Sequence, residues 1–344
     1  INLSSQYELF ELPEIIKECK SLEKLDISSN EIREIPEYVF SLPKLKELNF
    51  ARCSELQNKV IPFSSSQPLE KLSVCTNGSS SFFDDIEKLK TLKSLTLSGK
   101  INEIPKAIFN LTSLQELIMH DTQINTVPPE IKKLKSLKTL TINQYPFTPE
   151  DGFIKLNLEE AFNNLSQCEN LKELNLNYNG IKQIPEKVNL LKQLEIFSAQ
   201  DNLLVAYPKA IHDLTKLKEL NFGVNHLKEI PTGIGKLTEL KTLKLISNWQ
   251  QKIDIKNLFN EIDQLTSLET LDLHSCQSIE EIPETISNLT KLKKLDLDNN
   301  LIKKLPKSIL NMTHLKILRI GSNKVAQEEI AEIKAHLTST KISS

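Results

Sequence analysis

A short phrase, LxxLxLxxN, returns thirteen times in this chain, and its period constrains the fold more than any other feature. The copies begin at Leu22, Leu45, Leu69, Leu92, Leu114, Leu137, Leu171, Leu194, Leu217, Leu240, Leu268, Leu292 and Leu315. Successive starts lie 22 to 24 residues apart, except for intervals of 34 and 28 residues after Leu137 and Leu240. One unit of this length cannot bury its apolar side alone, so the copies must stack into an elongated solenoid.

The fourth and sixth places of each copy predict a short strand. Leu174 and Leu176 alternate with Asn175 and Asn177, so the leucines point inward and the amides point outward. Strands of successive copies then pair in parallel into one sheet. A proline that fixes φ opens the opposite segment, which we expect to be irregular or to form short helical turns. These prolines are Pro13, Pro36, Pro105, Pro128, Pro185, Pro208, Pro231, Pro283 and Pro306.

The ninth place predicts a ladder of asparagines that satisfy backbone groups where the chain leaves the strand. Its members are Asn30, Asn77, Asn179, Asn202, Asn225, Asn248, Asn300 and Asn323. Cys53, Thr122 and Cys276 substitute small side chains, whereas Lys100 and Tyr145 break the ladder.

This pattern resembles the leucine-rich repeat family, and the phrase IPxxIxxLxxL after the asparagine resembles its Ras-suppressor-like, intracellular-type subgroup. The resemblance covers nearly the whole chain. It implies an α/β horseshoe-shaped solenoid with a parallel β-sheet on the concave face and short helical or irregular convex segments. It also implies partner binding through the concave face, and it leaves the partner unspecified.

The spacing predicts a single domain over residues 1–344, with a partial repeat at 1–21 and thirteen repeats from residue 22. A helical cap is expected at about 325–344, where Ala326, Ile330, Ile333 and Leu337 follow helical spacing. Because the chain opens inside a repeat, we expect an N-terminal cap upstream of Ile1.

Charge and cysteine content exclude several classes. With 43 basic and 45 acidic residues, the chain has no general electrostatic attraction for nucleic acid or an anionic membrane. No apolar run approaches the roughly 20 residues of a membrane span. Five cysteines, an odd number without paired clusters, argue against a disulfide scaffold.

Departures from the repeat indicate where specific function lies. The second and third copies lose the Ile-Pro signature, and Phe63, Phe82 and Phe83 are expected to fill the core there. The long sixth copy ends in the helically spaced LEEAFNNL, and the long tenth copy contains IKNLFNEIDQL. These two insertions would flank a concave floor. The alternative is that they are tolerated loops beside a solvated floor.

The expected partner-binding surface is rich in amides, with Tyr145, Tyr178 and Trp249 as aromatic anchors. Its residues are Asn143, Gln144, Tyr145, Asn175, Asn177, Tyr178, Ser198, Gln200, Asp201, Asn221, Val224, Lys244, Ile246 and Trp249.

A second group, Asp272, His274, Asp296 and Asp298, occupies outward places on two adjacent strands. A solvated acidic patch is the simplest interpretation. The same residues could receive a basic side chain of a partner or bind Zn²⁺ or Mn²⁺.

No other constellation predicts chemistry. His120 and Asp121 form an outward pair without a nucleophile beside them. Cys75 is expected to point outward, whereas Cys19, Cys53, Cys168 and Cys276 are expected to be buried. Phosphate loops, GxSxG and HExxH are missing, so we predict no enzyme and no cofactor.

The sequence therefore favours a non-catalytic module that binds a protein partner between the insertions of the sixth and tenth repeats. A receptor for a glycan or small ligand is the first alternative, and the substrate-recognition arm of a larger enzyme is the second. Unpaired cysteines favour a cytoplasmic protein, but exported bacterial repeat proteins share this trait. The sequence is therefore compatible with a cytoplasmic protein and with one exported from a bacterium.

Overall fold

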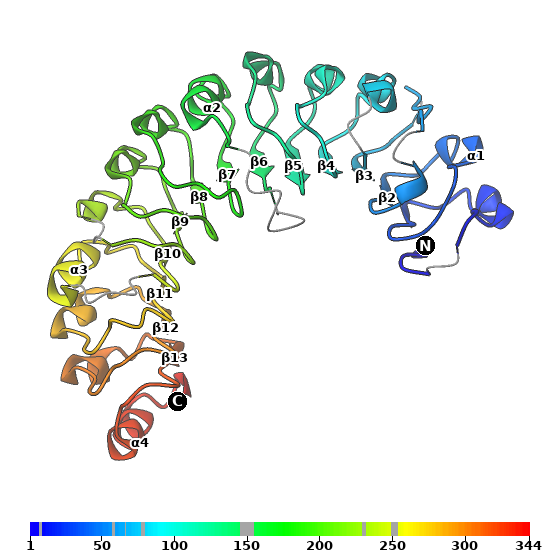
Figure 1. Cartoon of the computed structure of the whole chain (residues 1–344). Helices are drawn as coiled ribbons and strands as arrows, with labels where there is room; N and C mark the ends of the chain where they lie inside the picture. The colour runs from blue at the N-terminus through cyan, green and yellow to red at the C-terminus, as the bar shows by residue number, and fades with distance from the viewer. Residues whose placement is uncertain are drawn as a thin grey trace. The chain divides into compact units, whose positions relative to one another are not determined.

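The computed structural model describes residues 1–6, 9–56, 59–65, 67–76, 80–144, 155–228, 232–248 and 254–344. The chain falls into two compact units, Ile1–Asn175 and Leu176–Ser344, here called unit 1 and unit 2. Within each unit, the strands lie side by side along one face and the helical segments line the opposite face (Figure 1). The strand-lined face is called the concave face below.

All strand pairs within each unit are parallel. Unit 1 contains β1 (Lys24–Asp26), β2 (Glu47–Phe50), β3 (Lys71–Cys75), β4 (Ser94–Ser98), β5 (Glu116–His120), β6 (Thr139–Ile142) and β7 (Glu173–Asn175). Unit 2 contains β8 (Ile196–Ser198), β9 (Glu219–Asn221), β10 (Thr242–Lys244), β11 (Thr270–Asp272), β12 (Lys294–Asp296), β13 (Ile317–Arg319) and β14 (Lys341–Ser343).

The strand register follows the repeat frame. The fourth-place residue of one copy pairs with the fourth-place residue of the next, as Leu25 does with Leu48 and Leu243 with Leu271. These leucines and the sixth-place residues are buried. Phe63, Phe82 and Phe83 are also buried, as predicted, and Phe63 packs edge-on against Phe40. The parallel sheet and the inward leucines are thus confirmed.

Short helical turns occupy the convex segments. Unit 1 has α1 (Glu37–Phe40), α2 (Leu158–Leu165) and 3-10 helices at Glu14–Glu18, Ser54–Leu56, Ser80–Phe83, Ile86–Lys88, Lys106–Asn110 and Pro129–Lys133. Unit 2 has α3 (Ile255–Ile262), α4 (Gln327–His336) and 3-10 helices at Glu186–Leu190, Lys209–Asp213, Ile234–Lys236, Glu284–Asn288 and Lys307–Asn311. Prolines such as Pro105, Pro208 and Pro306 directly precede these turns.

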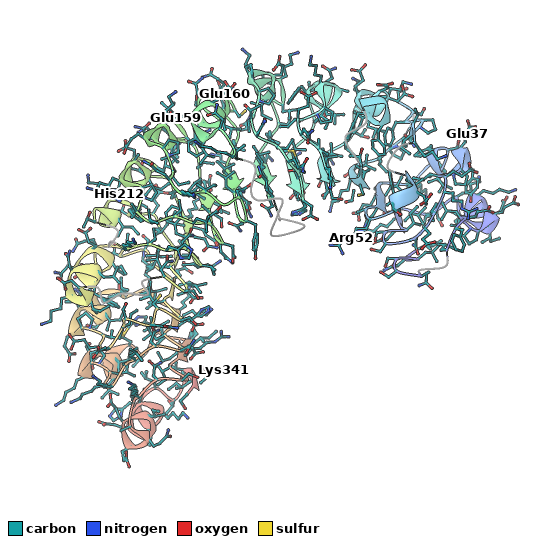
Figure 2. The ribbon with its side chains drawn as sticks, in the orientation of Figure 1. Glu37, Arg52, Glu159, Glu160, His212 and Lys341 are labelled. Carbon is teal, nitrogen blue, oxygen red and sulfur yellow. The ribbon has the colours of Figure 1, made fainter. Side chains whose placement is uncertain are left out.

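Both expected insertion helices are present. Asn157 caps α2 by accepting a hydrogen bond from the Glu160 backbone N–H at 3.3 Å, and Asp254 caps α3 through the Asn257 N–H at 3.2 Å. Each helix buries its apolar side. Figure 2 shows Glu159 and Glu160 on the helical side of unit 1 and Lys341 on the strand side of unit 2.

The asparagine ladder is confirmed at Asn30, Asn202, Asn225, Asn248, Asn300 and Asn323. Asn202 Nδ2 donates to the carbonyls of Leu176 at 2.9 Å and Ala199 at 3.0 Å, and its Oδ1 accepts from the Ile181 N–H at 2.9 Å. One amide thereby joins two successive copies. Cys276 makes the same inter-copy link, with its thiol donating to the Leu245 carbonyl at 3.2 Å. Asn77 and Tyr145 lie outside the described residues.

The residue just before the ladder place adopts a left-handed backbone in nearly every copy. Ten such residues have φ between 51° and 58°: Ser29, Arg52, Asp121, Tyr178, Asp201, Val224, Ser247, Ser275, Asn299 and Ser322. Gly99 holds the equivalent place with φ 106°, and a Cβ there would come within 2.2 Å of the Thr76 carbonyl oxygen. In these eleven copies the turn off the strand imposes a positive φ on residues of very different types.

The C-terminal helix differs in detail from the prediction. Ile330, Ile333 and Leu337 are buried as expected, but Ala326 is exposed and Val325 takes its place in the core. After α4 the chain forms β14, which pairs with β13 and was not expected. At the other end, the Leu3 N–H donates to the Asp26 carbonyl at 2.8 Å, so the partial copy aligns with β1. The single-domain assignment and an upstream cap remain predictions.

Candidate recognition surface on the concave face of unit 2

Four of the predicted residues form one hydrogen-bond network across neighbouring copies in unit 2. Asn177 Oδ1 accepts from Ser198 Oγ and from the Gln200 backbone N–H, both at 2.7 Å. Asn221 Nδ2 then donates to Gln200 Oε1 at 2.9 Å. Ser198 and Asn221 are buried rather than exposed, because their polar atoms are directed at neighbouring side chains. These side chains are therefore held in position by hydrogen bonds to one another, and they form an ordered polar surface on the strand side of unit 2.

A row of three residues runs along the edge of this surface. Tyr178, Asp201 and Val224 occupy the left-handed place of three successive copies, with φ of 57°, 52° and 52°. The Tyr178 N–H donates to the Gln200 carbonyl at 3.2 Å, and the Asp201 N–H donates to the Gly223 carbonyl at 3.0 Å. Tyr178 is 37% exposed and Val224 is 38% exposed. We call Tyr178, Asp201 and Val224 the edge row.

Ile246 adjoins the edge row. It is half-buried, and the Val224 N–H donates to its carbonyl at 2.6 Å. A Cβ at Gly223 would meet Ile246 Cβ at 3.2 Å, so the bare glycine lets Ile246 lie over the strand. Lys244, another predicted residue, pairs with Glu219 at 2.7 Å and is half-buried. The apolar part of the surface therefore consists of Tyr178, Val224 and Ile246.

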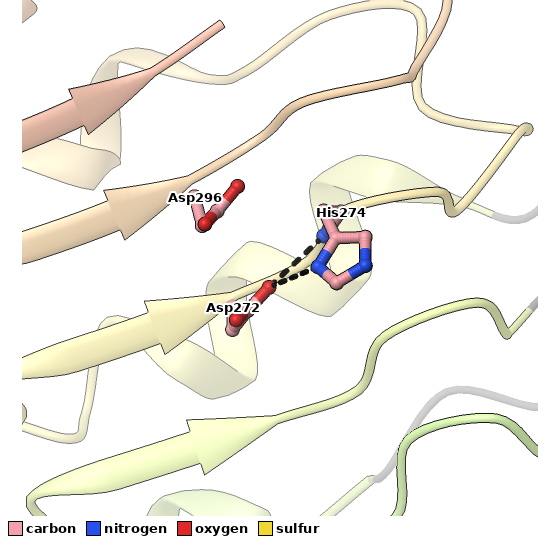
Figure 3. Close-up of side chains that lie close together, drawn as sticks. All are labelled: Asp272, His274 and Asp296. Carbon is pink, nitrogen blue, oxygen red and sulfur yellow. Dashed lines mark hydrogen bonds and ion pairs between the residues drawn. The ribbon is translucent and has the colours of Figure 1, made fainter. Parts of the chain in front are cut away.

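The second predicted group lies beside this surface on β11 and β12. Asp272 and Asp296 are buried and His274 is half-buried. His274 Nδ1 lies 2.9 Å from Asp272 Oδ1, and the backbone N–H of His274 donates to the same oxygen at 3.3 Å (Figure 3). The proximity expected from the sequence is therefore present.

Two cations that the sequence analysis did not single out neutralise this group. Lys294 Nζ lies 3.8 Å from Asp272 Oδ2 and 3.4 Å from Asp296 Oδ2, and Arg319 Nη1 lies 3.1 Å from Asp296 Oδ2. Lys294 and Arg319 occupy the third and fifth places of their copies, so the repeat frame contained the signal that they point to this face. The fold brings them onto the acids.

A metal ion would face competition at this position. Ligand atoms of Asp272, His274 and Asp296 lie within 4.8 Å of one another, which suits one divalent ion. However, Lys294 and Arg319 already supply the positive charge that an ion would bring. Asp298 lies outside the trio. Its Oδ1 accepts the Gly321 N–H at 2.5 Å, and burial, followed by the nearby Asp296, raises its pKa.

Three of the predicted residues lie in the described part of unit 1: Asn143, Gln144 and Asn175. Asn143 Nδ2 lies 3.4 Å from His120 Nδ1, and Asn175 ends β7 half-buried. Gln144 was expected to point outward but is buried, because its Nε2 donates to the Ile124 carbonyl at 2.5 Å. Tyr145 and Trp249, the other two predicted aromatic anchors, lie outside the described residues.

The cysteines correct two further expectations. Cys75 was expected to be outward and is buried, whereas Cys19 was expected to be buried and is half-exposed. Cys53, Cys168 and Cys276 are buried as predicted. Burial raises the pKa of Cys168 to about 11 and that of Cys276 to about 12, so neither thiol is activated.

Solenoid, register and ladder together define a leucine-rich repeat protein. A family model described as a leucine-rich repeat region matches residues 69–160 and 154–277, a leucine rich repeat model matches residues 266–325, and a BspA type leucine rich repeat region model matches residues 12–90. The chain belongs to the leucine-rich repeat family.

Similar proteins are diverse. The chain is 28% identical over 204 residues to the volume-regulated anion channel subunit LRRC8E of Xenopus tropicalis, covering 54% of this chain and 23% of the relative. It is 26% identical over 309 residues to TMV resistance protein N of Nicotiana glutinosa, covering 82% of this chain and 24% of the relative. The chain thus spans about a quarter of the length of these curated relatives.

Among solved structures, a leucine-rich repeat protein of Leptospira interrogans is similar over 100% of this chain and 95% of its own, with a TM-score of 0.62 and 27% identity. A complex of TLR13 with ssRNA13 shares the fold, with a TM-score of 0.66 and 22% identity over 94% of this chain and 53% of that one. The family fold supports a recognition module for proteins or other ligands.

Among the described helices, none is both long and apolar enough to cross a membrane.

Proposed function

We propose that the concave face of unit 2 is a non-catalytic surface that binds a protein partner, with the edge row and Ile246 at its centre. The observation that carries this proposal is the pairing of strain with exposure at Val224. A β-branched residue at positive φ is disfavoured, and its side chain is left partly in water. At the same place, the other residues with positive φ are Ser, Arg, Asp, Asn or Gly, apart from Tyr178.

Strained and exposed apolar residues do not stabilise a free solenoid. Such residues are characteristic of functional sites, and exposed apolar groups with polar neighbours are characteristic of protein interfaces. Tyr178 fits the preference of interface centres for aromatic side chains. The amide network beneath this row is already ordered by its own hydrogen bonds, so a partner would lose little free energy in ordering it.

The glycan alternative has less support. It relies on Asn and Gln side chains that reach sugar hydroxyls, yet Asn221 and Gln200 already bond to each other at 2.9 Å. The enzyme-arm alternative concerns residues beyond this chain and predicts the same concave surface.

Affinity capture from the native host tests the proposal. Wild-type protein is compared with a Tyr178→Ala, Val224→Asn double variant and with a Val205→Asn control, which removes an exposed valine outside the edge row. We expect the captured amount of at least one host protein to fall about tenfold with the double variant and to stay unchanged with the control. Equal capture by all three folded proteins would refute the proposal.

A further inference from the structure

We infer that the edge row receives an arginine side chain of the partner, with its guanidinium on Asp201. This inference rests on the proposed function and specifies the chemistry of that site. The starting observation is the order of the row, because a carboxylate lies between an exposed aromatic residue and an exposed aliphatic one. Adjacent strands lie about 4.8 Å apart, so Tyr178 and Val224 flank Asp201 at roughly that spacing.

Asp201 differs from the neighbouring acids in the groups that it contacts. Asp201 Oδ2 accepts a hydrogen bond from the neutral Gln200 amide at 2.7 Å. Glu219 has Lys244 at 2.7 Å, and Asp296 has both Lys294 and Arg319 within 4 Å. Among the described residues, no lysine, arginine or histidine forms an ion pair with Asp201. The carboxylate of the edge row is therefore held in position by an amide and left without a cation.

Arginine matches all three members of the row at once. Its guanidinium can form two parallel hydrogen bonds to a carboxylate and can stack on an aromatic ring. Its methylene stem can lie on aliphatic surface while the charge stays at the polar group. Here the fork would meet Asp201, the flat face would lie on Tyr178, and the stem would cover Val224 and Ile246. A purely apolar side chain would leave Asp201 desolvated without a partner, which costs free energy.

Lysine fits less well than arginine. It is a compact charge without a planar fork, so it could pair with Asp201 but could not also stack flat on the Tyr178 ring. The same chemistry already occurs within this chain, where the Arg33 guanidinium lies 5.3 Å from the centre of the Phe10 ring.

The probe for this inference is a phage-displayed library of random peptides selected on the immobilised full chain. Enriched peptides are synthesised with a fluorophore and titrated by fluorescence polarisation. We expect them to share an arginine, and we expect Arg→Lys in the peptide to weaken binding at least about tenfold. A selection that enriches no peptide, or only peptides without a required arginine, overturns the inference.

A double-mutant cycle assigns the arginine to Asp201. Asp201→Asn should weaken the arginine peptide at least about tenfold but change the affinity of its Arg→Met version little. Asp213→Asn is the charge-matched control, because Asp213 is exposed on a convex turn of the same unit. Additive effects of Asp201→Asn and Arg→Met overturn the inference.

The cycle also separates this inference from the proposed function. If the Tyr178→Ala, Val224→Asn double variant abolishes peptide binding and Asp201→Asn does not, the proposed binding surface of unit 2 is supported and the contact between arginine and Asp201 is refuted. If none of these variants weakens any selected peptide, both ideas fail.

Discussion

Asp272 and Asp296 lie directly opposite each other on the parallel strands β11 and β12, and the Lys294 ammonium lies within 3.8 Å of both carboxylates. Two like charges in register on adjacent strands repel each other, and this pair is also buried. The arrangement is therefore stable because Lys294, together with Arg319, compensates the charge.

Lys294→Met should destabilise the fold by about 1 to 3 kcal/mol, because it leaves two buried carboxylates with less compensation. Chemical denaturation measures the change. Lys293→Met is the matched control, since Lys293 pairs with Glu269 on an exposed surface, and it should change the stability by less than about 0.5 kcal/mol. Equal effects of the two variants would contradict the compensating role.

Val224→Asn should stabilise the chain by about 1 kcal/mol, because asparagine tolerates the left-handed backbone that valine resists. Val205→Asn is a suitable control, since Val205 is also exposed and has no positive φ. Denaturation midpoints of the two variants provide the comparison. A loss of stability at Val224 would show that its side chain contributes to the fold rather than to recognition.

Asn225→Ala should cost about 2 to 4 kcal/mol, because Asn225 Nδ2 donates to the carbonyls of Ala199, Phe222 and Gly223 and its Oδ1 accepts from Leu204. Asn225→Cys should retain part of that stability, as Cys276 does in its own copy. Asn163→Ala, at an exposed position of α2, controls for the loss of an amide in general. Thermal unfolding provides the comparison. If Asn225→Cys is no more stable than Asn225→Ala, the native cysteines do not replace the asparagine in the ladder.

Acid should weaken unit 2 through His212. The buried His212 ring stacks on the Tyr207 ring, with the two ring centres 5.4 Å apart. Burial is the largest cause that lowers the pKa of His212 below the ordinary 6.5, and the nearby Lys236 lowers it further. The unfolded chain therefore binds a proton before the folded chain does, and stability falls as pH drops below 6.5 toward the lowered value. Glu261 and Asp213 oppose the shift, whereas Lys209 adds to it.

His212→Phe should keep the stacking and remove this contribution, so the wild type should lose more stability than the variant between about pH 7.5 and about pH 5. His226→Phe, at an exposed position of the same unit, is the matched control for the replacement of a histidine by phenylalanine. Parallel pH profiles for wild type and His212→Phe would refute the prediction.

Thiol accessibility provides a separate check on the core. In the folded chain at about pH 8, one thiol should react quickly, because Cys19 is half-exposed and the other four cysteines are buried. Denaturant should then expose all five. Cys19→Ser should abolish the fast reaction, and a fast reaction that persists would place another cysteine at the surface.

The sequence alone determined the architecture of each unit. A leucine at the same place of each copy gives the strand register, because the inside and outside positions of a strand alternate locally and need no knowledge of distant residues. The same reasoning located the asparagine ladder and the helices α2 and α3. It also placed Asp272, His274 and Asp296 on one face.

Tertiary structure alone decided which outward residues are accessible. Gln144 and Cys75 are buried. Gln144, Ser198 and Asn221 form hydrogen bonds with residues of neighbouring copies, 20 or 21 positions away. The positive φ of Tyr178 and Val224 likewise comes from the turn that most copies share, not from their own preferences. Charge compensation by Lys294 and the uncompensated carboxylate of Asp201 depend on side-chain positions that a repeat period does not encode.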